Sequence, residues 1–270
     1  MKFNYYNIFK FFLSGIYRFW YRPTIIGKEN IPKEGRFIIV GNHIHVLDQS
    51  NIIISTKRQI SYMAKLEYFQ GKFAWFFKKT GCIPVNRSIK DNEATSAAIK
   101  VLNNDHALGL FPEGTRNRLK EEKIKSIIKK YNLEENTELL KCLSTTATSQ
   151  IQLLEGLIEK KKISKEDFIN NIYNVDEYLK QLVKEKIITE NEYYDSYLLP
   201  FKYGTVSMAN KTNSVIVPYI ITGEYKFRTK NLLIRIGKPI KPSSELEKEN
   251  DLLRKEMIKL LKENLKSSEK

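Results

Sequence analysis

The sequence predicts an α/β protein: a mixed central sheet flanked by helices, with an N-terminal membrane-interface helix and an inserted all-α subdomain. Three short apolar runs among helical patterns predict buried strands. A long segment without proline, and with one glycine, predicts the insertion. The expected domains are the interface helix at 1–22, the α/β domain at 23–118 and 199–270, and the helical insertion at 119–198.

The first 22 residues are rich in aromatic side chains, and their polar residues recur every three or four positions. Those polar residues are Asn4, Asn7, Lys10, Ser14 and Arg18. This spacing places them in one stripe of a helix, which favours a helix lying in the headgroup boundary of a membrane. A signal peptide would need a small-residue cleavage site, and a spanning helix would need a longer uncharged run. The alternative is a helix packed on the protein's own core.

The remaining elements follow from apolar spacing and from turn residues. Apolar runs at 37–40, 107–111 and 215–221 predict the buried strands, and 232–236 predicts a later strand that ends at Gly237 and Pro239. Helical spacing appears at 68–79 and at 94–102. The segment Ser244–Glu247 has the form of a capping box, which predicts the start of a C-terminal helix.

The insertion contains two similar segments, 157–168 and 182–193, at an offset of 25 residues. Each has the pattern of a helix, a short turn and a second helix capped by Ser164 or Thr189. The pattern weakly resembles the SHOCT module, whose usual role is interaction or oligomerisation, and so allows a protein partner. A solvated helical spacer is the alternative.

The chain is strongly basic, with 46 lysines and arginines against 31 aspartates and glutamates, a net charge of +15. Its partners are therefore expected to be anionic: phospholipid headgroups, nucleic acid or a phosphorylated substrate. No recognised nucleic-acid motif is present, and we expect the positive residues to concentrate in the insertion and the C-terminal helix. Cys82 and Cys142 lack CxxC spacing, so neither a disulfide framework nor a zinc site is indicated.

Three histidines, His43, His45 and His106, are the candidate bases near neutral pH. His43 directly follows an apolar strand, where open α/β sheets place catalytic groups. Asp48 can meet His43 only if His43 lies in the turn and Asp48 begins the next helix. In that case Asp48 would fix the imidazole tautomer and stabilise its charged form. His45 and Asp48, three residues apart, are the competing pair.

A second polar cluster, 110–118, follows another apolar strand. Arg116 can bind phosphate oxygens bidentately, Gly114 lets the backbone approach closely, and Thr115 can donate a hydrogen bond. Phosphate would repel Glu113, which is therefore expected to hold an arginine or a substrate hydroxyl. The alternative is a tight turn with a surface arginine.

Four blocks in this order strongly resemble those of the PlsC-type glycerolipid acyltransferase family. They are the NHxxxxD-like block Gly41–Asp48, the second block Gly81–Arg87, the third block Phe111–Arg116 and the fourth block Val217–Ile220. The resemblance implies that His43 and Asp48 are catalytic and that Glu113, Gly114, Thr115 and Arg116 belong to the glycerol-phosphate site. It also implies that Lys65 and Arg87 bind substrate.

The chain departs from the family pattern at two places. Position 45 is often a small polar residue in the family, and a histidine there leaves two candidate bases. Family members generally reach an LPFK segment about a dozen residues after the third block, whereas Leu199–Lys202 here follows the long insertion. A surface insertion is compatible with an intact site when its ends remain close.

The resemblance implies an acyltransferase of the EC 2.3.1 class. It would move a fatty acyl group from acyl-CoA or acyl carrier protein to 1-acylglycerol 3-phosphate and so form phosphatidic acid for phospholipid biosynthesis. No cofactor or metal would be needed, and the protein would lie on the cytoplasmic face of the cell membrane as a peripheral or monotopic protein. The alternatives are acylation of glycerol 3-phosphate or another lysolipid, and a non-catalytic basic protein that binds anionic membranes.

Overall fold

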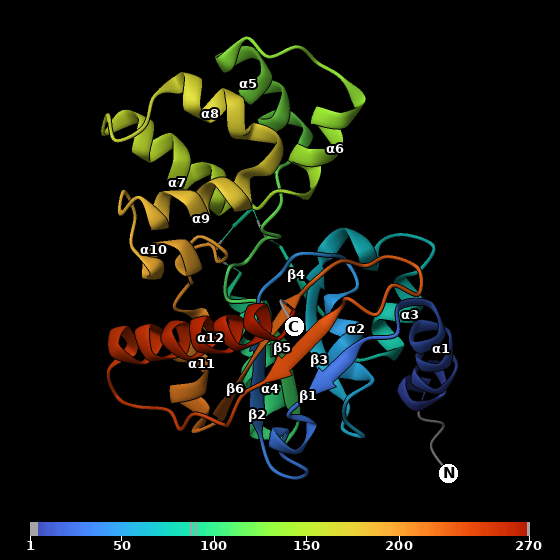
Figure 1. Cartoon of the computed structure of the whole chain (residues 1–270). Helices are drawn as coiled ribbons and strands as arrows, with labels where there is room; N and C mark the ends of the chain where they lie inside the picture. Colours follow the sequence, from blue (N-terminus) through green and yellow to red (C-terminus); the bar gives the residue numbers. More distant parts are fainter. Residues whose placement is uncertain (1–4, 87, 90, 269–270) are drawn as a thin grey trace. The chain divides into compact units, whose positions relative to one another are not determined.

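The computed structural model describes residues 5–86, 88–89 and 91–268 (Figure 1). The chain divides into two compact units, which we call the α/β unit (1–114 and 201–270) and the helical unit (115–200). Asn4, which was expected to begin the polar stripe of the first helix, lies outside the described residues. Each unit is described by itself below.

In the described part of the chain, seven strands form one sheet in the order β1-β7-β6-β2-β5-β3-β4. The strands are β1 Thr24–Ile26, β2 Phe37–Gly41, β3 Ile60–Lys65, β4 Ile83–Val85, β5 Ala107–Leu110, β6 Val215–Thr222 and β7 Leu233–Ile236. Strands β6, β2, β5, β3 and β4 are parallel to one another, and β7 is antiparallel to β6. The predicted mixed α/β fold with a central sheet is therefore confirmed, and the carboxyl ends of the five parallel strands lie at one edge.

The central strands are nearly continuous apolar runs because helices cover both faces of the sheet. Residues 37–40 of β2 are 0% exposed. The four predicted strands are present, each with a shift of one residue at one end. Strands β1, β3 and β4 were not predicted. Two of them have only three residues, and β3 includes Ser61 and Lys65, so these strands lack a local apolar signature and depend on pairing with their neighbours.

Helices of the α/β unit pack on the two faces. They are α1 Tyr5–Tyr21, α2 Asp48–Ile53, α3 Ala74–Lys79, α4 Asn92–Asn103, α11 Gly204–Thr212 and α12 Leu246–Ser268, with 3-10 turns η1 Lys28–Asn30 and η2 Leu66–Phe69. Ile52 of α2 packs with Phe37 and Ile39 on one face. Leu260 of α12 lies beside Gly237 and Pro218 on the other. Figure 1 shows α1 and α12 on opposite sides of the sheet.

Two helix predictions need correction. The segment 68–79 is not one helix, because the 3-10 turn η2 ends at Phe69 and α3 begins only at Ala74, after a turn in which Ala74 N donates to Gly71 O. A glycine there favours a break over a continuous helix. The predicted capping box at Ser244–Glu247 is also displaced, because helix α12 begins at Leu246, two residues beyond Ser244. The backbone N–H of Ser243 donates to the carboxylate of Glu249.

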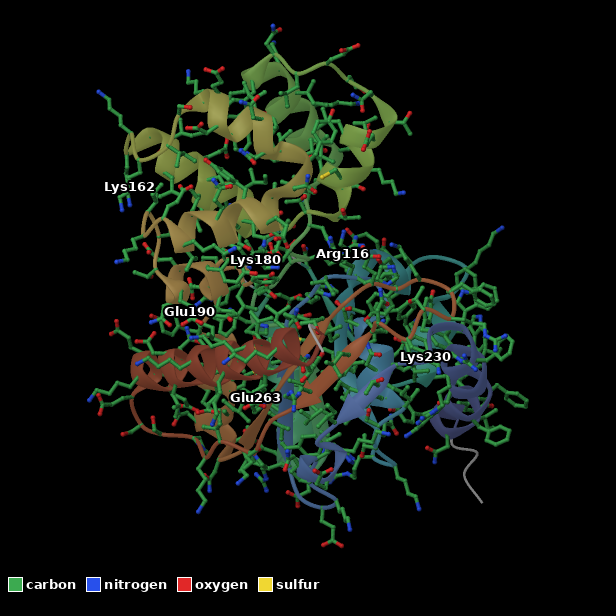
Figure 2. The ribbon with its side chains drawn as sticks, viewed as in Figure 1. Arg116, Lys162, Lys180, Glu190, Lys230 and Glu263 are labelled. Carbon is green, nitrogen blue, oxygen red and sulfur yellow. The ribbon has the colours of Figure 1, made fainter. Side chains whose placement is uncertain are left out.

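The expected location of the positive charge was wrong. The α/β unit has 31 basic and 16 acidic residues, whereas the helical unit has 15 of each, so the α/β unit accounts for the whole excess. Lysines are frequent in the helical unit, but acidic residues alternate with them. Figure 2 labels charged side chains of both units, among them Lys230 and Glu263 of the α/β unit and Lys180 and Glu190 of the helical unit.

The helical unit contains the two predicted helix–turn–helix segments. Its helices are α5 Glu121–Tyr131, α6 Thr137–Thr145, α7 Thr148–Glu159, α8 Lys165–Asn171, α9 Val175–Lys184 and α10 Glu190–Asp195, with the 3-10 turn η3 Ile172–Asn174. Lys161 and Lys186, 25 residues apart, both have positive φ (55° and 60°) in the turns after α7 and α9. Ser164 and Thr189 form capping boxes at α8 and α10. The expected capped helices are thus confirmed, while the resemblance to SHOCT remains a prediction.

None of the helices in the described ranges has the length and apolar character needed to cross a bilayer.

Candidate active site

The site lies where the carboxyl ends of β2 and β5 meet. The connection from β2 runs through α2 on one face toward β3, whereas the connection from β5 ends in α11 before β6. In open α/β sheets, a crevice forms where the connections from two neighbouring strands lead away in opposite directions, and ligands bind in that crevice. His43 follows β2, and Phe111 and Glu113 follow β5, so the first and third sequence blocks meet at this point.

His43 and Asp48 are paired. His43 lies in the turn after β2, Asp48 is the first residue of α2, and Nδ1 of His43 lies 2.8 Å from Oδ2 of Asp48. These are the two conditions under which the sequence allowed the pair to form. The side chain of Asp48 is fully buried. With Nδ1 held by the carboxylate, Nε2 is the nitrogen available to accept a proton from a substrate.

Four donors hold the carboxylate of Asp48. Its Oδ2 accepts from the ring of His43 and from the backbone N–H groups of Ile44 (2.7 Å) and His45 (2.8 Å). Its Oδ1 accepts from the hydroxyl of Tyr225 at 2.6 Å. A buried carboxylate needs such partners because charge is costly to remove from water.

The competing histidine has a different environment. The ring of His45 stacks on Tyr225 with 4.2 Å between ring centroids, and its Nδ1 accepts from the backbone N–H of Leu47 at 3.3 Å. His45 reaches Asp48 through its backbone N–H. Of the two candidate bases, His43 is therefore the one whose ring has the orientation expected of a catalytic imidazole.

The third sequence block packs directly on the first. Phe111 stacks on the ring of His43 with 4.0 Å between centroids. Glu113, only 3% exposed, accepts from the backbone N–H of His43 at 2.9 Å. Its carboxylate therefore holds the turn that carries His43, a contact that the sequence did not suggest. Gly114 has a φ of +72°, a conformation that favours glycine.

Lys202 is a candidate ligand that the sequence analysis did not select. Its backbone N–H donates to Pro112 O at 2.9 Å, and its side chain lies against Gly114, where an added Cβ would meet Lys202 Cε at 2.8 Å. The sequence feature that could have identified Lys202 is the LPFK segment Leu199–Lys202, which the family resemblance had already marked. Tyr225 was also missed, and it has no such signal, because it contacts Asp48 across 177 residues of sequence.

The other predicted substrate-binding residues, Lys65, Arg87, Thr115 and Arg116, are not placed in contact with the His43–Asp48 pair by the part of the chain that the structure describes. Lys65 is exposed at the carboxyl end of β3, on the same edge of the sheet as His43. Arg87 lies outside the described residues. Thr115 and Arg116 follow Gly114 in the chain and belong to the helical unit. Their contacts with substrate remain predictions.

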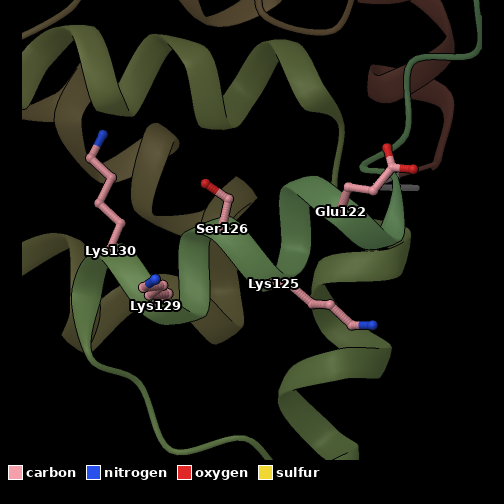
Figure 3. A pocket seen from close by; sticks show the side chains of 5 residues that line it. All are labelled: Glu122, Lys125, Ser126, Lys129 and Lys130. Carbon is pink, nitrogen blue, oxygen red and sulfur yellow. The ribbon is translucent and has the colours of Figure 1, made fainter.

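A shallow depression in the helical unit is lined by one face of α5 (Figure 3). Its lining residues are Glu122, Lys125, Ser126, Lys129 and Lys130. Two of its lysines have acidic partners, since Lys125 pairs with Glu121 and Lys130 pairs with Glu155. These ion pairs are typical of a solvated helix face.

A histidine paired with a buried carboxylate at this edge of an α/β sheet is an arrangement that can abstract a proton as a general base. The chain belongs to the acyltransferase family, whose sequence model matches residues 22–222. The family resemblance found in the sequence is thereby confirmed.

Two curated relatives and one solved structure are similar to this chain. The 1-acyl-sn-glycerol-3-phosphate acyltransferase of Bacillus subtilis is 35% identical over 94 residues, 34% of this chain and 47% of that protein. The enzyme of the same name from Borreliella burgdorferi is 39% identical over 97 residues, 35% of this chain and 39% of that protein. The matches therefore span less than half the length of either relative.

The crystal structure of the 1-acyl-sn-glycerophosphate acyltransferase PlsC from Thermotoga maritima has a TM-score of 0.56 to this chain. The match covers 97% of this chain and 83% of that protein, at 18% sequence identity. At this identity the likeness supports the fold.

Proposed function

We propose that this protein transfers a fatty acyl group from an acyl thioester to the free hydroxyl of 1-acylglycerol 3-phosphate, forming phosphatidic acid. The observation that carries the proposal is the 2.8 Å contact between His43 Nδ1 and Asp48 Oδ2 at the carboxyl edge of the sheet. Family membership and the names of the two curated relatives support the reaction class and the acceptor.

In the proposed mechanism, His43 Nε2 removes the proton from the acceptor hydroxyl, and the hydroxyl oxygen attacks the thioester carbonyl. The tetrahedral intermediate then collapses, the C–S bond breaks, and the thiolate takes the proton from the imidazolium. Asp48 stabilises the imidazolium while it exists. A positioned base typically contributes about 10²- to 10⁴-fold in rate. The reaction needs no cofactor, and the donor is acyl-CoA or acyl carrier protein.

The acceptor phosphate requires cationic groups near His43. Lys202, beside Gly114, supplies one, and Lys65 at the end of β3 can supply another. Arg87 and Arg116 complete the proposed set through their places in the second and third blocks. Because Glu113 accepts from His43 N–H, we assign it to holding the catalytic turn. Its expected contact with a substrate hydroxyl remains part of the proposal.

We further propose that α1 lies in the membrane surface. Two residues of its polar stripe contact the protein: Lys10 donates to Thr56 O, and Arg18 donates to Ile54 O at 2.6 Å. Its large apolar side chains are instead exposed, with Phe11 76% and Phe12 64% exposed. A helix packed on the protein's own core would bury those rings. The excess positive charge of the α/β unit complements anionic headgroups.

The exposed apolar surface extends beyond α1. It consists of Phe11, Phe12, Leu13, Ile16, Phe19 and Trp20 of α1 together with Phe73, Trp75 and Phe227. Contacts link these elements: Phe9 of α1 packs on Trp75, and Trp20 packs on Phe227 with 4.8 Å between centroids. Aromatic rings are favoured at the boundary between acyl chains and headgroups, which supports a peripheral or monotopic protein.

The test is thiol release from a long-chain acyl-CoA by the purified full-length protein, with and without 1-acylglycerol 3-phosphate in detergent micelles. Wild type should release thiol only with acceptor, and His43→Ala should lower the rate at least about 100-fold. His106→Ala is the matched control, because His106 is exposed and precedes β5 at the opposite edge of the sheet.

Near-normal activity of His43→Ala would contradict the assigned base and promote His45. If wild type is inactive with acyl-CoA, the next donor to test is acylated carrier protein. The alternative acceptors to test are glycerol 3-phosphate and other lysolipids. Failure with all of them would overturn the proposal in favour of a non-catalytic basic membrane-binding protein.

A further inference from the structure

A chain of hydrogen bonds connects α1 to the catalytic carboxylate. The hydroxyl of Tyr17 in α1 donates to Asn51 Oδ1 (2.8 Å), and Asn51 Nδ2 donates to the hydroxyl of Tyr225 (2.7 Å). The Tyr225 hydroxyl in turn donates to Asp48 Oδ1 at 2.6 Å. We call Tyr17, Asn51 and Tyr225 the hydroxyl chain. It reaches the oxygen of Asp48 that His43 does not use.

Two members of the hydroxyl chain are shielded from water, and the third, Tyr225, is partly buried. Asn51 is 0% and Tyr17 is 7% exposed. Burial, and secondarily the charge of Asp48, hold the pKa of Tyr225 well above its usual value, so its hydroxyl stays protonated and can donate. Burial likewise raises the pKa of Tyr17. In such surroundings each hydrogen bond is stronger than in water, and a missing partner is costly.

The loop that carries Tyr225 is fastened to α1. The loop connects β6 to β7, and its Arg228 N–H donates to Trp20 O at 2.7 Å. The ring of Tyr225 packs edge-on against Tyr21 of α1 with 5.5 Å between centroids, and Phe227 packs against Trp20. The position of Tyr225, and with it the hydrogen bond to Asp48, therefore depends on α1.

We infer that Tyr225 is a positioning residue for the His43–Asp48 pair, and that α1 sets its position through Tyr17, Asn51 and the β6–β7 loop. The inference rests on the proposed function and adds that the interfacial helix and the base are parts of one hydrogen-bonded assembly. Torsion about the Cβ–Cγ bond of an aspartate is broad. A donor on Oδ1 as well as the donors on Oδ2 fixes the carboxylate plane, and the plane fixes the imidazole.

The hydrogen bond from Tyr225 to Asp48 also predicts how its removal changes the binding of a proton by His43. The Tyr225 hydroxyl partly neutralises the charge on Oδ1, so its removal leaves more negative charge facing the imidazolium, which then keeps its proton to higher pH. The ionisable groups that face the pair or pack nearby come from several elements and stay in place in the variants below. They are His45 in the turn, Glu113 after β5, Lys202 before α11, Tyr62 of β3 and Tyr219 of β6.

The experiment compares full-length wild type with Tyr225→Phe and Tyr17→Phe. The control is Tyr21→Phe, which keeps the ring that touches Tyr225. NMR titration of the imidazole C–H signals provides a readout independent of turnover. With only three histidines, single His→Ala variants assign the signals. The His43 midpoint should move to higher pH in Tyr225→Phe, and to a smaller extent in Tyr17→Phe, and should not move in Tyr21→Phe.

Kinetics give the second readout. In the acceptor-dependent assay, Tyr225→Phe should lower kcat about tenfold with little change in acceptor KM, because the lost hydrogen bond acts on the base rather than on binding. A His43 titration unchanged in Tyr225→Phe would overturn the inference, and so would a raised KM with unchanged kcat. An inactive wild type would instead contradict the proposed function, and the NMR titration would still decide the inference.

Discussion

The side-chain amide of Asn42 pairs with both backbone groups of Ile221. Asn42 Nδ2 donates to Ile221 O at 2.9 Å, and Ile221 N donates to Asn42 Oδ1 at 2.8 Å. The two residues are buried and lie 179 positions apart. The amide therefore continues the bonding between β2 and β6 beyond the end of β2, and it anchors the residue that directly precedes His43.

Asn42→Ala should destabilise the protein and reduce turnover. It leaves the buried N–H and C=O of Ile221 without these partners, at about 1–3 kcal/mol for each unsatisfied group. Asn42→Asp should also be destabilising, because its ionised carboxylate faces the carbonyl oxygen of Ile221 without a donor. Urea unfolding measures the loss. Asn103→Ala, at an exposed position, is the control, and equal midpoints for Asn42→Ala and wild type would contradict the prediction.

Gly109→Ala should destabilise the sheet by overpacking. The ring of Tyr62 on β3 occupies the space beside Gly109 on β5, so an added methyl group would overlap it. Such overpacking costs about 1–3 kcal/mol. The urea midpoint should fall in Gly109→Ala and stay close to wild type in Gly204→Ala, whose added methyl meets no neighbour within 4 Å.

Ser164→Ala and Thr189→Ala should each destabilise the helical unit by about 1 kcal/mol, the usual value of an N-cap hydrogen bond. Ser164 Oγ accepts from Asp167 N at 2.9 Å, and Thr189 Oγ1 accepts from Glu192 N at 3.1 Å. Hydrogen exchange should show faster exchange of those two amides in the respective variants. In Ser144→Ala, which removes only a bond to a helical carbonyl, both amides should exchange as in wild type.

Glu155→Gln should destabilise the protein at neutral pH and have a diminishing effect as the pH falls. Partial burial raises the pKa of Glu155, but hydrogen bonds from Lys130 and Lys123 outweigh it, so the pKa lies below its usual value. A carboxylate whose pKa is lowered in the folded state stabilises that state at pH values above the pKa of the unfolded state, about 4.3. This stabilisation is lost as the pH falls through the pKa of the folded state. The urea midpoints of wild type and Glu155→Gln should converge as the pH falls from 7 to 3. A difference between the two midpoints that stays constant over this range would contradict the prediction.

Lys202→Met should raise the KM for a phosphorylated acceptor, because it removes a cation beside Gly114 and keeps most of the apolar stem. The loss of one phosphate contact should raise KM about tenfold, and added salt should narrow the difference. Lys211→Met, at the end of α11, is the control. Equal acceptor KM values for Lys202→Met and Lys211→Met would remove Lys202 from the site.

The sequence by itself determined the elements whose signal is local. Continuous apolar runs marked β2, β5, β6 and β7, and residues able to cap a helix marked the starts of α8 and α10. Short polar blocks directly after two of those strands marked His43, Asp48 and Glu113. The predictions of the strands and of the capped helices succeeded because burial on both faces of a parallel sheet, and hydrogen bonding at a helix start, act on residues close together in the chain. The roles of His43, Asp48 and Glu113 stay predictions.

Tertiary structure alone decided the features that depend on distant partners. Strands β1, β3 and β4 exist through pairing with neighbours, and the tertiary structure places the ring of His43, rather than that of His45, against the carboxylate of Asp48. Tyr225 reaches Asp48 from the β6–β7 loop, and Lys202 reaches Gly114 from 88 positions further along the chain. Their common physical reason is that the parallel sheet brings the carboxyl ends of sequence-distant strands to one edge, and no local pattern specifies which side chains meet there.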